Sequence, residues 1–235
     1  MAQSNIESFA RTYGMPVAPI EAGRACNDAS NSMLPPRLFE YWDRFGFSKF
    51  LHGYFQILNP ADYREALATW MSGKPFAESD QYHAIRMDCF GNIRIWGIRT
   101  GHTYDIDVGF HSVFDYERDN SGKIRDGRSD RMIESLIFGI LPQDVIPTAE
   151  KSDIRLFFAA KDKLGDLGHN QIYAPVPAIP LGGQMRVEDL HIVDAPSYLT
   201  MVAEIAPPRV MTMKDLTHLA FGVGADETLA GLLKK

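Results

Sequence analysis

Residues 38–63 contain aromatic side chains at a higher density than the rest of the chain, in an order typical of two amphipathic helices around a short β segment. The first predicted helix has apolar residues at i, i+3, i+4 and i+7: Leu38, Tyr41, Trp42 and Phe45. Gly46 supplies the left-handed position that ends this helix, and Asn59 with Pro60 begins the next. The second helix repeats the apolar spacing at Tyr63, Ala66, Leu67, Trp70 and Met71. The segment therefore predicts a buried aromatic core.

The rest of the chain continues in the same mixed pattern. Residues 82–108 predict a β-meander, because Ile93 and Ile95 alternate with Arg94 and Trp96. Helical spacing and capping residues predict further helices over residues 4–13, 129–137, 153–164 and 194–206, after Thr212, and from Asp226 onward. The polar stretch 115–128 predicts an exposed loop. We therefore expect an α+β fold with two lobes, residues 1–115 and 130–235, joined by a polar loop over residues 116–129. Each lobe is expected to be a small, mostly antiparallel sheet packed with helices.

Composition limits the function classes. The formal net charge is −6, which is a weak argument against non-specific nucleic-acid binding because that binding needs a basic surface. The two cysteines, Cys26 and Cys89, have neither zinc-site spacing nor the spacing of a disulfide framework. The sequence shows no secretory signal and no run approaching the ~18 apolar residues of a membrane-spanning helix. We therefore expect a cytoplasmic protein without a cofactor, bound nucleic acid or membrane association.

The motifs of the first half follow one another in an order that resembles a known family. They are Tyr41-Trp42, Phe45-Gly46-Phe47, Gly53-Tyr54-Phe55, Asn59-Pro60 and Trp70, followed by Cys89-Phe90-Gly91, Trp96-Gly97 and Thr100-Gly101-His102. This order resembles the GAD-like domain, a bacterial module named for its likeness to an insert in some tRNA-handling enzymes. The resemblance implies that the first lobe is a GAD-like domain.

The second half carries a separate resemblance. Its segment from Leu164-Gly165 to Gly182-Gly183 is similar to the C-terminal domain of certain type VI secretion immunity proteins. The matching residues are Tyr173, Pro177, Ala178, Leu181, Gly182 and Gly183. The chain departs from that family's pattern at Gln171, Ala174 and Pro175. These departures make the predicted backbone conformation of this segment less specific. They remove no known catalytic group.

Together, the two resemblances imply a non-enzymatic immunity protein, or antitoxin. Such a protein binds its cognate nuclease effector, as a heterodimer or larger complex, and occludes or distorts the toxin's active or DNA-binding site. An acidic partner suits a nuclease, because the nuclease needs a positive surface to hold phosphate and opposite charge steers association. The candidate interface residues are all acidic: Asp105, Asp107, Asp115, Glu117, Asp119, Glu188, Asp189 and Asp194.

Two alternatives stay open at this point. The first is a metal-dependent hydrolase that uses His102, Asp105, Asp107 and His111, because Asp105 and Asp107 share one strand face and a turn could bring His102 near. The second is an RNA-associated accessory module, by analogy with the insert that named the GAD-like domain. The negative net charge counts against this second alternative.

Overall fold

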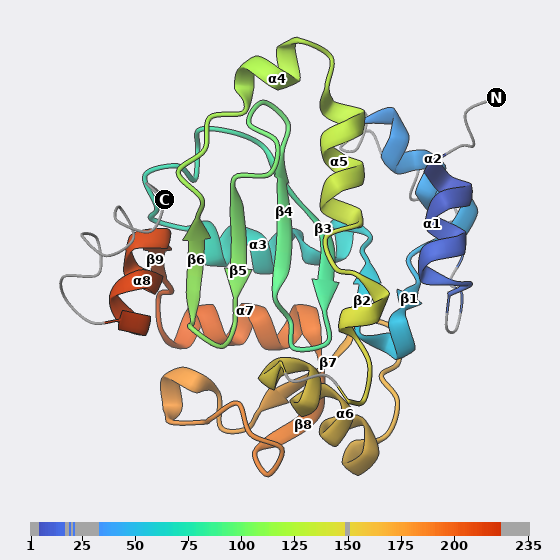
Figure 1. Cartoon of the computed structure of the whole chain (residues 1–235). Helices are drawn as coiled ribbons and strands as arrows, with labels where there is room; N and C mark the ends of the chain where they lie inside the picture. Colours follow the sequence, from blue (N-terminus) through green and yellow to red (C-terminus); the bar gives the residue numbers. More distant parts are fainter. Residues whose placement is uncertain (1–4, 17–18, 20, 22–32, 149–150, 222–235) are drawn as a thin grey trace.

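A computed structural model of the chain describes residues 5–16, 19, 21, 33–148 and 151–221. Its main element is a seven-stranded sheet in the order β1-β2-β3-β4-β5-β6-β9, and a two-stranded sheet of β7 and β8 lies below it in Figure 1. The strands of the large sheet are β1 (Lys49–Phe50), β2 (Phe55–Ile57), β3 (Tyr82–Asp88), β4 (Ile93–Gly97), β5 (Tyr104–Asp107), β6 (Ser112–Asp115) and β9 (Arg209–Thr212). With helices on both faces of the sheet, the predicted α+β class is confirmed.

The large sheet is antiparallel from β1 to β6, which confirms the predicted meander over residues 82–108. The last strand, β9, pairs with β6 in parallel, with Ser112 opposite Arg209 and Asp115 opposite Thr212. A parallel pair needs a long crossover connection, and here the connection contains every element from α4 to α7. Strand β9, near the end of the described chain, therefore belongs to the same sheet as the strands of the first half.

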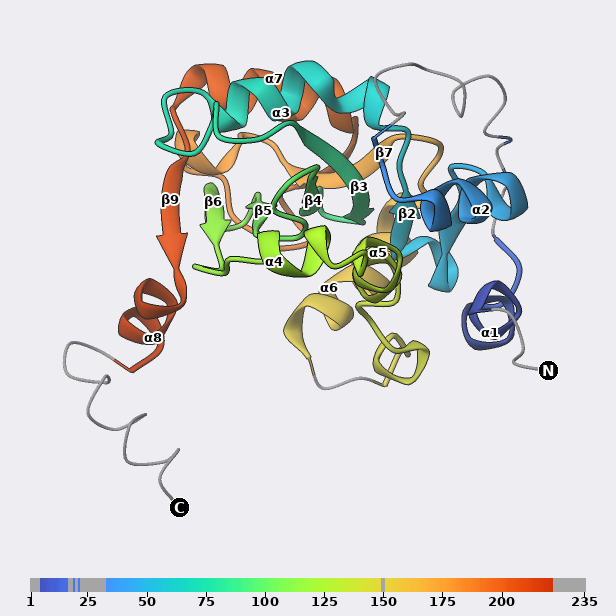
Figure 2. The same cartoon turned by 90° about the horizontal axis from the view of Figure 1, so that it is seen from above.

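Helices α3 (Arg64–Met71) and α7 (Ala195–Ile205) form a layer on one face of the sheet. Figure 2 shows both helices on one side of the strands, with α4, α5 and α6 on the other. The apolar strand side chains that face this layer include Met87, Ile93, Ile95, Ile106 and Val113. Between the two helices, Trp70 is fully buried and its Nε1 donates to the carbonyl oxygen of Leu199 at 2.9 Å. Because α3 precedes and α7 follows most of the sheet in the sequence, this core belongs to both halves of the chain.

The opposite face of the sheet is covered mainly toward β3. Helix α5 (Ser129–Ile137) packs there through Ile133 and Ile137, in one apolar cluster with Ile85 and Trp96. The short helix α4 (Ser121–Arg125) lies at the upper end of the strands in Figure 1. Helices α1 (Asn5–Tyr13) and α2 (Pro36–Phe45) extend this second core beyond β1 and β2.

The aromatic segment folds as its spacing predicts. All four apolar positions of α2 are buried, and the backbone N–H of Gly46, at φ 64°, donates to the carbonyl of Trp42 at 2.7 Å. The Asn59 side chain accepts from the N–H of Ala61 at 3.2 Å, so it caps the 3₁₀ turn η4 (Pro60–Tyr63) that leads into α3. Two further 3₁₀ turns occupy Leu51–Gly53 and Pro142–Asp144. The prediction of a helix-β-helix unit is confirmed.

The second half adds α6 (Ser152–Leu164), β7 (Gln171–Pro175), the 3₁₀ turn η6 (Ile179–Leu181), β8 (Leu190–Asp194), α7 and α8 (Met213–Phe221). The backbone passes so closely at Gly183 that an added Cβ would lie 1.7 Å from the carbonyl oxygen of Pro177. Only glycine fits there, which accounts for the Gly-Gly pair that the sequence resemblance rested on. The predicted cap of α7 is also confirmed, since the Asp194 carboxylate accepts from the N–H of Ser197 at 3.1 Å.

The structure differs from the sequence prediction in two local details. Part of the expected polar loop is helical, because α4 occupies Ser121–Arg125 and the Asp119 carboxylate accepts from the N–H of Ser121 at 2.9 Å. The sequence favours Ser129 as the cap of the helix that follows it, but Ser129 is the first residue of α5 and the cap is Arg128. The predicted tail helix from Asp226, and Cys26, lie outside the described residues. Among the described helices, none combines the length and hydrophobicity needed to cross a bilayer.

Candidate functional site

The sheet face opposite α3 and α7 is polar where β4, β5 and β6 cross it, and Figure 1 shows these strands unobstructed from that side. Successive strand side chains point to opposite faces. Ile93, Ile95 and Ile106 pack into the layer with α3 and α7, so Arg94 and Asp105 point the other way. We call this surface, from Arg94 across Asp105 to Tyr116, the polar face. It is the part of the sheet whose chemistry is available for binding.

Four side chains on the polar face form a hydrogen-bonded group, the Asp105 cluster (Arg94, His102, Asp105 and Tyr116). The Arg94 guanidinium pairs with the Asp105 carboxylate and donates to the Tyr116 hydroxyl at 2.8 Å. That hydroxyl in turn donates to the carboxylate at 2.5 Å, and His102 Nε2 lies 2.9 Å from the other carboxylate oxygen. Asp105 is only 4% exposed. Its charge therefore holds three neighbours in place and is not presented to solvent.

His102 is neutral in this cluster. Burial, followed by the positive charges of Arg94 and Arg118, lowers the pKa of His102 to about 3 even though a carboxylate lies beside it. A neutral imidazole has one donor nitrogen, and the carboxylate of Asp105 can only accept, so Nε2 carries the hydrogen. The low pKa of His102 thus results first from burial and second from the nearby guanidinium groups.

We expect acidification to destabilise the protein through His102. The pKa of His102 is about 3 in the folded protein, against an ordinary value of 6.5, so the unfolded chain binds the extra proton first as the pH falls. The contribution of neutral His102 to the free energy of unfolding is fully present when the pH is above the ordinary histidine pKa. Below that pKa, the contribution falls by roughly 1.4 kcal/mol per pH unit. Urea unfolding at pH about 7 and about 5 should show this loss, and His102→Gln should remove most of it. An equal pH dependence in both proteins would contradict this assignment.

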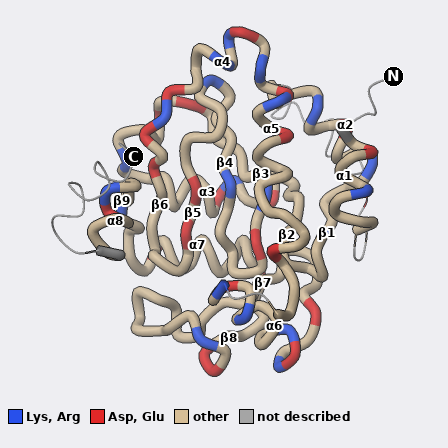
Figure 3. Tube along the Cα trace, viewed as in Figure 1, with Lys and Arg blue, Asp and Glu red and all other residues tan. Residues whose placement is uncertain are grey.

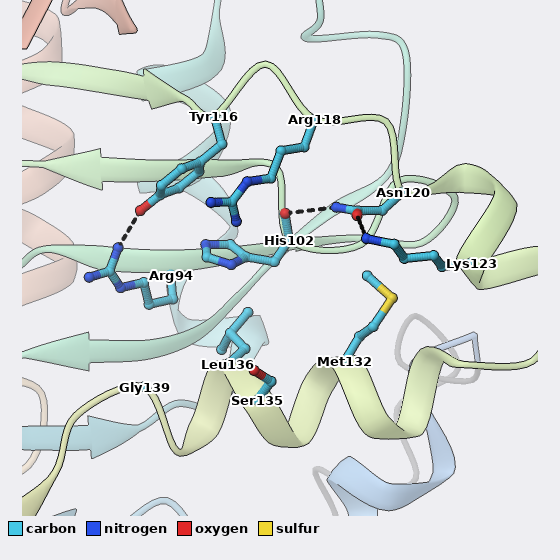
Figure 4. A pocket seen from close by; sticks show the side chains of 10 residues that line it. All are labelled: Arg94, His102, Tyr116, Arg118, Asn120, Lys123, Met132, Ser135, Leu136 and Gly139. Atoms are coloured by element: carbon cyan, nitrogen blue, oxygen red, sulfur yellow. Dashed lines mark hydrogen bonds between the residues drawn. The ribbon is translucent and has the colours of Figure 1, made fainter. Parts of the chain in front are cut away.

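A cavity of about 460 Å³ opens beside the Asp105 cluster, between the sheet, α4 and α5. We call it the basic pocket. Its polar lining is Arg94, His102, Tyr116, Arg118, Asn120 and Lys123, and Met132, Ser135, Leu136 and Gly139 complete it from α5 and the residue beyond it. Figure 4 shows the three cationic side chains spread along this space, with Arg94 turned to the Tyr116 hydroxyl, Arg118 between Tyr116 and His102, and Lys123 turned to Asn120.

Short contacts link the lining residues into one unit. The Arg118 guanidinium lies over the Tyr116 ring, 4.7 Å from its centre, and the His102 ring lies 5.1 Å from the same ring. Asn120 is 5% exposed; its amide donates to the carbonyl of His102 at 3.2 Å and accepts from Lys123 Nζ at 3.0 Å. The wall of the basic pocket is therefore held in place by its own hydrogen bonds and ring contacts.

The acidic interface candidates do not form one patch. Asp105 is 4% exposed and is covered by its partners Arg94, His102 and Tyr116. In the register of β5 and β6, Asp107 lies opposite Ser112 and Asp115 lies opposite Tyr104. These two carboxylates therefore lie at opposite ends of the β5–β6 hairpin. Burial raises the pKa of Asp107, whose carboxylate accepts from the N–H of Phe110 at 2.9 Å. Figure 3 shows acidic positions on β5 and a basic position on the neighbouring strand β4.

The other candidates divide into two groups. Glu117 and Asp119 are exposed and follow Asp115 toward α4, beside the basic pocket. Glu188 borders a second cavity of about 580 Å³ between α6 and the loop before β8. Asp189 pairs with Arg186 at 2.8 Å, and Asp194 caps α7.

The residues of the metal-hydrolase alternative are not brought together. His102 precedes the Tyr104–Asp115 end of the β5–β6 hairpin, whereas His111 lies at its Asp107–Ser112 end, where its Nε2 contacts the carbonyl of Ala206 at 2.8 Å. Among the described residues, no group of three or more His, Cys, Asp and Glu side chains is placed to hold a metal ion. Burial also raises the pKa of the Cys89 thiol well above its ordinary value, which keeps it protonated.

Sequence reasoning missed the basic residues of this site. The alternation in β4 predicts Arg94 on the side opposite Ile93 and Ile95, but no local pattern predicts that Arg94, Arg118 and Lys123 line one cavity. One signal was present, because Tyr116 and Arg118 continue the two-residue alternation of β6 beyond its end. Lys123 carried no comparable signal, since its position depends on α4.

Two protein-family models match the chain. Residues 4–109 match the family model of the GAD-like domain, and residues 142–206 match that of the T6SS immunity protein Tdi1, C-terminal. The chain thus carries both family domains, in this order. Both sequence resemblances are confirmed.

A likeness among solved structures agrees with the fold. The crystal structure of Atu4351 from Agrobacterium tumefaciens matches with a TM-score of 0.68 and 24% identity, over 88% of this chain and 91% of that chain. At this identity the likeness shows a shared fold. A comparison with curated proteins gave no match.

The polar face joins the GAD-like domain to residues that neither family model covers. The GAD-like match contains β1 to β5, and the Tdi1 C-terminal match contains α6, β7, β8 and α7. The unmatched residues between them include β6, α4 and α5. Arg94 and His102 of the GAD-like domain therefore meet Tyr116, Arg118 and Lys123 of this connecting segment in the basic pocket.

Proposed function

We propose that this chain is an immunity protein that binds a cognate nuclease effector of type VI secretion in the cytoplasm and blocks its action on DNA. The match of residues 142–206 to the T6SS immunity protein Tdi1 C-terminal family carries this proposal. The GAD-like match in the preceding residues supports it, because the two domains occur in the order that the sequence resemblance implied.

The polar face supports a binding role. One side of the sheet is closed by α3 and α7 around an apolar core, whereas Arg94 and Tyr116 lie on the other side. Charged groups fixed by hydrogen bonds lose little freedom on association, and complementary charge sets orientation and association rate. The effector would occupy this face, either covering its own DNA-binding surface or being held in an inactive geometry.

The proposal includes a non-enzymatic role and a division of the chain. His102 and Asp105, the most enzyme-like pair, are engaged with each other and with Arg94 and Tyr116. We assign residues 1–115 to the GAD-like part, residues 116–129 to the connection and residues 130–235 to the immunity part. The shared core of α3 and α7 and the pairing of β6 with β9 join the outer parts in one folded unit.

Co-expression tests the function directly. The protein encoded by the adjacent gene is produced in a bacterial host with and without this chain. We expect growth arrest in its absence, rescue in its presence, and co-purification of the two proteins. A catalytically inactivated effector should still co-purify, because binding and not catalysis is proposed. Absence of both rescue and co-purification would contradict the immunity proposal.

A charge-reversal pair tests where the effector binds. Glu117→Lys with Glu188→Lys alters two exposed carboxylates, one beside the basic pocket and one beside the second cavity. We expect about tenfold weaker effector binding at low salt and a smaller difference at high salt, because these charges are screened. Glu65→Lys with Glu78→Lys is the matched control, since both residues are exposed and lie in or just after α3 on the other side of the sheet. Unchanged binding with unchanged salt dependence would show that the electrostatic account is wrong.

A further inference from the structure

We propose that a groove along α5 binds an extended acidic segment of the effector, whose carboxylates pair with Arg118 and Lys123. The groove consists of the basic pocket and a neighbouring cavity of about 600 Å³, which share Arg94, Ser135 and Gly139 as lining residues. We call the two cavities together the α5 groove. This inference deepens the proposed function and rests on it, because the effector supplies the segment.

The α5 groove follows the helix along the polar face and has the length of a short peptide segment. Its helical side extends from Met132, beside the basic pocket, to Gly139, just beyond α5. At the helical rise these residues span about 10 Å, which three or four residues of an extended chain cover at about 3.3 Å each. Where the two cavities adjoin, Ser135 has a small side chain and Gly139 has none, and both residues are exposed. A chain can therefore pass from one cavity into the other.

Charge is distributed unequally along the α5 groove. The basic pocket is lined by Arg94, Arg118 and Lys123, and no Asp or Glu side chain of the described residues lines it. The neighbouring cavity has three carboxylates and three cations in its lining: Asp88, Asp144, Asp153, Arg86, Arg94 and Lys151. Glu117 and Glu188 lie outside both linings. An acidic segment is therefore attracted to the end of the groove near α4, and the carboxylates at the other end keep it from sliding further.

Arg118 and Lys123 are free to pair with separate carboxylates. The Arg118 guanidinium lies 4.7 Å from the centre of the Tyr116 ring, and Lys123 Nζ donates to Asn120 at 3.0 Å. Neither cation forms an ion pair within the described part of the chain, and Figure 4 shows them apart from each other. Side chains at i and i+2 of an extended segment point to the same side, about 7 Å apart. Two carboxylates with this spacing can each meet one cation.

Helix α5 is fixed at both ends, so the groove is present before a partner arrives. Near the first turn, the backbone N–H of Arg37 donates to the Asp130 carboxylate at 2.9 Å. At the last turn, the Arg86 guanidinium donates from Nη1 to the carbonyl oxygens of Leu136 and Ile137 at 3.3 and 3.1 Å. Arg86 is 5% exposed, so this link between β3 and α5 is buried. A preformed site loses less conformational entropy when its partner binds.

A single-stranded nucleic acid is the other linear polyanion, and the α5 groove suits it less. Such a strand carries a phosphate at every nucleotide and needs a positively charged track along its whole length. Three carboxylates line one end of the groove, and the formal net charge of the chain is −6. A lining of both charge signs favours a protein segment with acidic residues at one end.

A groove-filling variant tests the site with the catalytically inactivated protein encoded by the adjacent gene. Ser135→Leu enlarges a side chain where the two cavities adjoin, and Ala68→Leu is the matched control, an exposed position of α3 on the other side of the sheet. We expect Ser135→Leu to weaken effector binding at least about tenfold and Ala68→Leu to change it less than about twofold. Thermal unfolding checks that both variants are folded. Unchanged binding by Ser135→Leu would overturn the groove and leave the proposed function standing, whereas a wild-type protein that does not bind the effector would overturn both.

Charge reversal tests the chemistry of the segment. Arg118→Glu with Lys123→Glu reverses two exposed cations of the groove, and Arg125→Glu with Arg128→Glu makes the same charge change at exposed positions that do not line it. We expect the first pair to weaken effector binding at least about tenfold at low salt and less at high salt. The second pair should change binding less than about twofold. Equal weakening by both pairs would refute the assignment of these two cations.

Carbodiimide crosslinking of the complex identifies the occupant, because it joins a lysine amine only to a carboxylate in contact with it. Mass spectrometry should find Lys123 joined to an Asp or Glu of the effector, with no such link from Lys214, an exposed lysine of α8. A complex without a Lys123 crosslink would contradict the acidic segment. Saturable binding of a fluorescent single-stranded RNA of about 12 nucleotides at about 50 mM salt would assign the groove to nucleic acid and also overturn the proposal.

Discussion

Replacing Trp70 with alanine is expected to lower the free energy of unfolding by about 3–5 kcal/mol, which is the range for removing a large buried aromatic side chain. Trp70 is fully buried between α3 and α7, its indole donates to Leu199, and its ring lies 5.2 Å from that of His111. The cavity left behind would adjoin both helices. Urea unfolding followed by circular dichroism measures the loss without depending on tryptophan fluorescence.

Because the Trp70 contacts join the two halves, the loss should appear in a single transition. Residues of the GAD-like part and of the Tdi1-type part form one apolar cluster around Trp70, so neither can unfold without exposing the other. Trp70→Phe keeps a ring and loses the hydrogen bond, and should cost only about 1–2 kcal/mol. Met201→Ala, at a half-exposed position of α7, serves as the surface control. Two separate transitions in the wild-type protein would contradict the shared core.

Removing the Asp105 carboxylate is expected to have the second largest effect. Asp105→Ala would leave Arg94, His102 and Tyr116 without their common acceptor. Breaking a fully buried pair costs about 3–5 kcal/mol. Because the Arg94 side chain is 38% exposed and regains water, we expect about 2–4 kcal/mol here. Chemical unfolding of the variant measures this loss.

A double-mutant cycle tests the origin of that effect. Arg94→Ala combined with Asp105→Ala should cost less than the two single changes together, because the second change removes a charge that the first had left unpaired. Asp126→Ala is a suitable control, since Asp126 is an exposed carboxylate at the end of α4. Strict additivity of Arg94→Ala and Asp105→Ala would argue against the Asp105 cluster as a coupled unit.

Much of the local structure follows from residue patterns. The helical spacing of Leu38 to Phe45, the stop at Gly46 and the caps at Asn59 and Asp194 all depend on neighbours within a few residues, and each forms as predicted. The same is true of the alternation in β4, which separates Ile93 and Ile95 from Arg94. Short-range sterics and hydrogen bonds set these features, so the sequence alone carries them.

Residue patterns predict least where polar side chains form hydrogen bonds with one another. The stretch around α4 looked like a solvated loop, yet Asn120 is buried and joins His102 to Lys123. Asp105 looked like a surface acid because its strand is polar on one side, yet it is covered by its own partners. A polar residue on a strand gives the same sequence pattern whether its hydrogen bonds are formed with water or with an arginine.

The sequence by itself determined the described helices other than α4, the meander, the order of the two family domains and the aromatic scaffold, because each depends on local spacing or an ordered motif. Only the tertiary structure decided that β9 returns to pair with β6, that α3 and α7 share one core, and that Arg94, Arg118 and Lys123 line one pocket. These three outcomes join residues far apart in the chain. Such contacts form where the summed burial and charge pairing of the whole fold outweigh the entropy of closing long loops, and no local pattern records that balance.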